Sequence, residues 1–107
     1  MHDLLIRGGT VVTASGPRKL GIFVDDGRIT SLSTDEIDSD KFEKVIDAEG
    51  MIVVPGGIEP HAHIGGPRQP ERSGAEAVSK AALLGGTTTV LDFATQIPGY
   101  DLYHALE

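Results

Sequence analysis

The stretch Met51-Ile-Val-Val-Pro-Gly-Gly-Ile-Glu-Pro-His-Ala-His63 decides the fold, because an apolar run ends there in two histidines. Residues two apart in a strand project from the same face, so the imidazoles of His61 and His63 can reach one metal ion. Neutral imidazoles suit Zn²⁺, and a catalytic zinc site takes three protein ligands plus a water. On pattern alone, such a pair is also typical of surface or hydrogen-bonded histidines. The spacing therefore predicts either a pair of surface or hydrogen-bonded histidines or one part of a metal site.

The residues that follow predict a strand, a helix and a second strand. Residues 58–64 form the first expected strand, and a loop rich in proline and glycine follows it at 65–72. Ser73-Gly-Ala-Glu76 predicts a capping box at the start of a helix that runs to about Leu84 and stops at Gly85-Gly86. Residues 87–94 are rich in β-branched side chains and predict the second strand. A helical connection of this length predicts parallel strands joined by a right-handed crossover.

The first half of the chain predicts short strands. Asp26-Gly27 is a strong hairpin signal, because both central residues of a type I′ turn need positive φ. Residues 33–43 carry five acids and one lysine, and we expect a solvated loop there. Strands are expected at residues 4–7, 10–13, 21–25, 28–33, 44–47 and 51–54, and a second helix begins at residue 102.

Length and composition narrow the class of protein. At 107 residues the chain is too short for a complete (β/α)₈ barrel of about 250 residues, so the pattern predicts a small β domain followed by the first repeats of such a barrel. The net charge of −7 argues against nucleic acid and anionic membranes as partners. Without cysteine there is no disulfide, thiolate metal site or cysteine nucleophile. No apolar run approaches about 20 residues and no signal peptide is seen, so we expect a cytoplasmic protein.

Two segments carry a resemblance to a known family. VVPGGIEPHAH at residues 53–63 and AALLGGTTTVLDFA at residues 81–94 resemble the amino-terminal part of dihydropyrimidinases and hydantoinases, which are cyclic amidohydrolases of the metal-dependent amidohydrolase superfamily. The opening, DLLIRGGTVVT at 3–13 with VDDGRI at 24–29, is similar to the β-sandwich start of the same enzymes. The resemblance implies an α/β chain: part of a β-sandwich at residues 1–54, then the first βαβ unit of a TIM-type (β/α)₈ barrel at residues 55–107.

The resemblance also implies an activity and a cofactor. Such enzymes open a small cyclic amide or ureide ring with a metal-bridging hydroxide at a binuclear zinc site, and Mn²⁺ or Co²⁺ can replace Zn²⁺. His61 and His63 match the first metal pair. The family's carboxylated lysine, two further histidines and aspartate are expected on later strands, so we expect the 107 residues alone to be inactive. We assign no catalytic residue to this chain.

Three further side chains have open roles. Glu59 stands where relatives commonly carry aspartate, and we place it on the face of the histidines; it either orients a ligand histidine or accepts backbone amides near Gly56 and Gly57. Arg68 either meets a substrate carboxylate or lies in a solvated loop. Asp92 interrupts an apolar strand, where a buried charge needs a partner, so a structural hydrogen-bond role is the better interpretation.

Two other functions remain open at this point. One is a non-catalytic binding module that keeps the fold. The other is a metal-assembled module in which two copies supply four histidines to one ion. If the chain is a fragment of such an enzyme, the unpaired edge of the strand at 87–94 predicts self-association of the isolated chain, and we expect a homo-oligomer.

Overall fold

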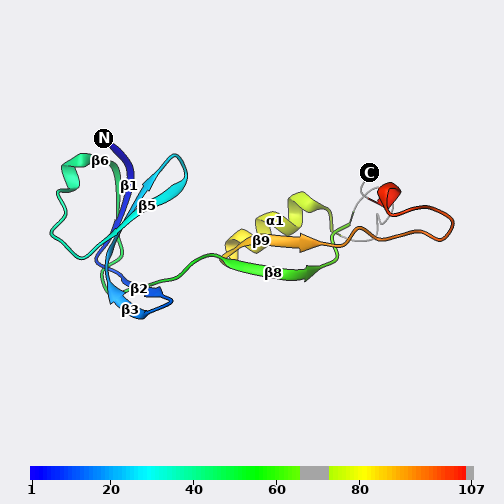
Figure 1. Ribbon diagram of the computed structural model, residues 1–107, viewed down its shortest axis with the longest axis horizontal. Helices are drawn as coiled ribbons and strands as arrows, with labels where there is room; N and C mark the ends of the chain where they lie inside the picture. Colours follow the sequence, from blue (N-terminus) through cyan, green and yellow to red (C-terminus); the bar gives the residue numbers. More distant parts are fainter. Residues whose placement is uncertain (66–72, 106–107) are drawn as a thin grey trace. The chain divides into compact units, whose positions relative to one another are not determined.

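The computed structural model describes residues 1–65 and 73–105. The chain divides into two compact units, Met1–Pro55 and Gly56–Glu107, and each is described by itself. Figure 1 shows the elements of both units in chain order.

The first unit consists mostly of strands in two sheets. The four-stranded sheet has the order β5-β4-β1-β6, in which β1 and β6 are parallel and the other pairs antiparallel. The three-stranded sheet has the order β3-β2-β7, in which β2 and β3 are antiparallel and β2 and β7 parallel. The bounds are β1 His2–Arg7, β2 Thr10–Thr13, β3 Gly16–Lys19, β4 Gly21–Asp25, β5 Arg28–Ser33, β6 Phe42–Asp47 and β7 Ile52–Val53.

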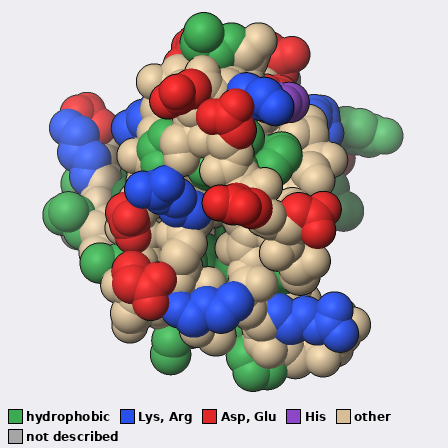
Figure 2. Space-filling model, turned by 90° about the vertical axis from the view of Figure 1, so that its left-hand side faces the viewer, with side chains coloured by type: hydrophobic (Ala, Val, Ile, Leu, Met, Phe, Trp, Pro, Cys, Tyr) green, Lys and Arg blue, Asp and Glu red, His purple; other side chains and the backbone are tan. Residues whose placement is uncertain are grey.

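The core of this unit draws side chains from both sheets, as a β-sandwich does. Leu5 is fully buried, and the other buried apolar residues are Val11, Ile22, Phe42 and Ala48. Acidic and basic side chains are interleaved on the face shown in Figure 2, so this face carries no continuous basic patch.

The predicted hairpin is confirmed, because Asp26 and Gly27 have φ of 49° and 70° and connect β4 to β5. The expected solvated loop at 33–43 is wrong in part. It contains a 3-10 helix, Ser39–Lys41, and Phe42 is buried in the core because burial of an aromatic side chain is favourable, while its charged neighbours Lys41 and Glu43 stay exposed. Strand β3 was not expected.

The second unit contains the strand–helix–strand segment. Strands β8 (Gly57–Ala62) and β9 (Thr87–Asp92) pair in parallel, which confirms the expected pairing, and α1 (Ala75–Leu84) connects them (Figure 1). Helix α1 ends at Gly85, whose N–H reaches the carbonyls of the last turn, as predicted.

Two details of this unit differ from the prediction. The N-cap is Gly74 and no side chain caps the helix, because Gly65 and Gly74 form a β-bridge and the Ser73 carbonyl accepts the Gly65 amide. The expected second helix is a single 3-10 turn, Tyr103–Ala105, within the described residues.

Apolar surface remains uncovered in this unit. Within its described residues no side chain is buried, and Ile58, Leu91 and Phe93 are 66%, 49% and 46% exposed. In residues 1–65 and 73–105, no helix has both the length and the apolar character that a membrane crossing needs.

Candidate metal centre

A bulge in β8 sets the direction in which its side chains point. Glu59 pairs with Val90 and Ala62 with Asp92, so three steps along β8 match two along β9. The extra residue falls at Pro60 and His61, and proline is tolerated at a bulge because its missing N–H is not needed by the ladder.

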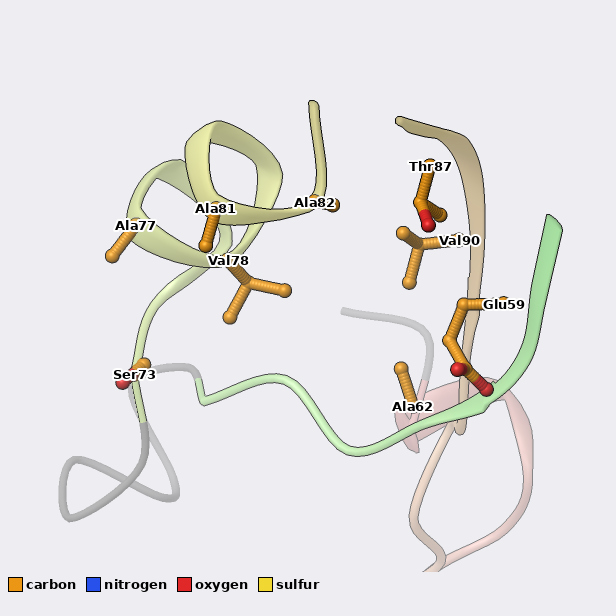
Figure 3. Close-up of a pocket in the computed structure, with 9 residues that line it drawn as sticks. All are labelled: Glu59, Ala62, Ser73, Ala77, Val78, Ala81, Ala82, Thr87 and Val90. Carbon is orange, nitrogen blue, oxygen red and sulfur yellow. The ribbon is translucent and has the colours of Figure 1, made fainter. Parts of the chain in front are cut away.

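The bulge places Glu59 on the helix side of the sheet. Glu59 and Ala62 both line an open pocket of about 380 Å³ between α1 and the two strands, together with Val78 and Val90 (Figure 3). Neither histidine lines this pocket. The expectation that Glu59 shares the histidines' face is therefore wrong, because a bulge breaks the two-residue alternation.

His61 and His63 lie together at the carboxyl end of the strand pair. Their ring centroids are 5.3 Å apart and both side chains are exposed. Two imidazoles that bind one tetrahedral Zn²⁺ at about 2.0–2.1 Å place their centroids roughly 5 Å apart. The spacing of the pair and its nitrogen donors thus fit one metal ion.

Phe93, which the sequence reasoning did not single out, contacts both histidines. Its ring centroid lies 4.5 Å from that of His61 and 4.9 Å from that of His63, where the rings stack at 23°. Its position in the sequence could have indicated this contact, because Phe93 directly follows β9 and therefore lies at the same edge of the parallel strand pair as the histidines.

Two carboxylates hold the backbone around these rings. The His61 amide donates to Oε1 of Glu59 at 2.9 Å. Oδ1 of Asp92 accepts the amides of Ile64 at 3.1 Å and Phe93 at 2.7 Å. The hydrogen-bond role predicted for Asp92 is confirmed, although its side chain is exposed at the strand end and not buried.

The described residues supply only part of a metal site. Among residues 1–65 and 73–105, no three His, Cys, Asp or Glu side chains converge closely enough to hold a metal ion. Arg68 lies outside the described residues, so both alternatives for it, a substrate contact and a solvated loop, stay open.

A second histidine cluster lies in the first unit and has a structural role. Nδ1 of His2 donates to Oδ2 of Asp25 at 2.8 Å, and its ring stacks on Phe42 with centroids 5.0 Å apart. The hydrogen bond from His2, followed by that from Thr30, lowers the pKa of Asp25 below its ordinary value. Sequence reasoning missed this cluster.

Comparison with known proteins places the chain in a family, although no family model matches it. It is 38% identical over 110 residues to a D-hydantoinase of Streptomyces coelicolor, covering 96% of this chain and 23% of that protein. It is 36% identical over 97 residues to an allantoinase of Escherichia coli O1:K1, covering 90% of this chain and 21% of that one. The solved structure of dihydropyrimidinase from Brevibacillus agri NCHU1002 matches with a TM-score of 0.84 and 35% identity, over 99% of this chain and 23% of the other.

The chain belongs to the dihydropyrimidinase and hydantoinase family. The resemblance found in the sequence is confirmed, and the match covers the amino-terminal portion of the family's proteins. The chain spans about a fifth of the length of these relatives, from 21% to 23%. The metal ligands, the reaction and the substrate are therefore matters for proposal.

Proposed function

We propose that the protein is a metal-dependent hydrolase that opens the ring of a small cyclic amide or ureide, of dihydropyrimidine or hydantoin type. The observation that carries the proposal is the pair His61 and His63, 5.3 Å apart at the carboxyl end of a parallel strand pair. The names of similar proteins, D-hydantoinase and allantoinase, support hydrolysis of cyclic amides in general.

The proposed architecture extends the described units. The first unit is part of a β-sandwich, and β8, α1 and β9 are the first βαβ unit of a (β/α)₈ barrel. In such barrels the working residues lie at the carboxyl ends of the strands, which is where the histidines lie.

Each residue of the pair has a defined task. His61 and His63 would hold the metal through ring nitrogens, and Glu59 accepts the backbone amide of His61. When bound, Zn²⁺ lowers the pKa of a water to about 7 and polarises the carbonyl under attack. Mn²⁺ and Co²⁺ are the alternative metals, of which Mn²⁺ prefers oxygen ligands to imidazole.

Two histidines do not complete this site. A catalytic zinc site needs about three protein ligands, so the remaining ligands come from residues outside the described ranges. We expect the 107-residue chain by itself to show no turnover. We also expect the 107-residue chain by itself to form a homo-oligomer, because Leu91 in β9 and Phe93 directly after it are exposed.

The test is ring opening by the complete gene product, measured with hydantoin and dihydrouracil. We expect chelation to remove activity and added Zn²⁺ to restore it. His61→Asn and His63→Asn are expected to lower turnover about 100-fold or more, since removing even an outer partner of a ligand costs 10–100-fold. His104→Asn, in the same unit but in contact with Tyr100, is the control.

Retained turnover in both histidine variants would refute the proposal. Zinc binding that changes the oligomeric state without any ring opening would favour the metal-assembled module.

A further inference from the structure

We propose that Phe93 is a positioning residue that orders the imidazoles of His61 and His63 before a metal ion arrives. The inference rests on the proposed metal site and adds a residue to it. It assigns Phe93 no contact with substrate or with the reacting atoms.

The three rings form a closed set of contacts. The centroid distances are 5.3 Å between the histidines, 4.5 Å from Phe93 to His61 and 4.9 Å from Phe93 to His63. Each imidazole therefore has the other imidazole and the phenyl ring as neighbours. Rotation of either imidazole away from this arrangement loses its contact with Phe93.

The backbone that carries these rings is tied together at one atom. Oδ1 of Asp92 accepts the amide of Phe93 and that of Ile64, the residue after His63. The backbone next to His63 is thereby joined to the backbone of Phe93. Glu59 holds the amide of His61 in the same way. Asp92 thus joins the backbone of Phe93 to that beside His63, while Glu59 holds the backbone of His61.

The simpler interpretation is that Phe93 is an apolar side chain at a strand end. Leu91 offers the comparison, because it lies two residues earlier on β9 and is 49% exposed, against 46% for Phe93. By strand alternation both side chains project to one face. If Phe93 were only an apolar side chain, substitution of Phe93 and substitution of Leu91 would affect the histidines equally.

The expected effect follows from the cost of ordering side chains. Ordering one mobile side chain weakens binding by roughly twofold to tenfold. Two imidazoles ordered in advance avoid much of that loss. We therefore expect Phe93→Leu to weaken Zn²⁺ binding by about tenfold, the lower end of effects seen for partners of metal ligands.

The experiment uses the 107-residue chain and NMR signals of the histidine ring protons, with ZnCl₂ as the probe. Without metal, we expect the ring protons of His61 and His63 to be shifted upfield by Phe93, and the shift to disappear in Phe93→Leu. Phe93→Tyr should keep both the shift and the affinity to within about twofold, because the stacked ring remains. Leu91→Ala should keep both as well.

The outcomes separate this inference from the proposed function. Equal Zn²⁺ affinity in wild type, Phe93→Leu and Leu91→Ala would overturn the positioning role while leaving the metal site intact. An equal loss in Phe93→Leu and Leu91→Ala would also overturn it, since it would show only lost apolar surface. If Zn²⁺ perturbs neither histidine in the 107-residue chain, the positioning role fails, whereas the proposed function is tested separately by ring opening in the complete gene product.

Discussion

Asp92 is expected to fix the geometry of the strand ends, and Asp92→Ala tests this. The change removes the acceptor of two amides, those of Ile64 and Phe93. Hydrogen bonds to charged groups contribute about 1.5–3 kcal/mol when shielded from water. Asp92 is exposed, so we take roughly 0.5–1 kcal/mol for each bond, or about 1–2 kcal/mol together.

From this loss of stabilisation we expect a measurable increase in the rate of amide hydrogen exchange. About 1–2 kcal/mol corresponds to roughly a 5- to 30-fold faster amide exchange at Ile64 and Phe93, measured by NMR in D₂O. Asp92→Asn keeps a side-chain oxygen and should accelerate exchange less. Asp101→Ala is the matched control, since Oδ1 of Asp101 accepts the His104 amide in the same unit. Unchanged exchange at Ile64 in Asp92→Ala, or equal acceleration in Asp101→Ala, would refute the reasoning.

Three further predictions concern the first unit. Leu5→Ala, at a side chain that is 0% exposed, should lower the free energy of unfolding in urea by about 2–5 kcal/mol, and a loss below about 1 kcal/mol would contradict the assigned core. Because the pKa of Asp25 is lowered in the folded state, its stabilisation is present above the ordinary aspartate value of about 3.9 and is lost as pH falls through the folded-state value. Asp25→Asn should therefore flatten the acid branch of the stability curve, and an unchanged branch would count against this role. Gly27→Ala, at φ 70°, should cost about 1 kcal/mol in thermal unfolding, and equal or higher stability would show that no left-handed turn is needed.

Local backbone signals in the sequence predicted much of the fold. Asp26-Gly27 requires two residues at positive φ, and few other dipeptides provide them, so the β4–β5 hairpin was predictable with its bounds. Gly85-Gly86 similarly predicted the end of α1. These signals act over a few residues and need no distant partner.

The errors lie where distant contacts decide. Ser73 does not cap α1. Gly74 is extended where it bridges with Gly65, so the helix begins at Ala75 and its N-cap is Gly74. Pro17 did not suggest a strand, but β3 is at the edge of its sheet, where proline is tolerated.

The candidate site shows the same division between local signals, which were predictable, and distant contacts, which were not. The spacing of His61 and His63 identified the pair, because a single residue separates them. The bulge at Pro60 that turns Glu59 to the helix side depends on the register with β9, and no local pattern reports it. Phe93 is 30 residues from His63 along the chain, so its stacking depends on the parallel pairing.

The most direct test of the account is to locate the metal itself. We would crystallise the complete gene product with Zn²⁺ and record anomalous diffraction at the zinc edge. We expect a peak about 2.0–2.1 Å from a ring nitrogen of both His61 and His63. A zinc peak elsewhere, with both imidazoles making no bond to it, would contradict the central claim.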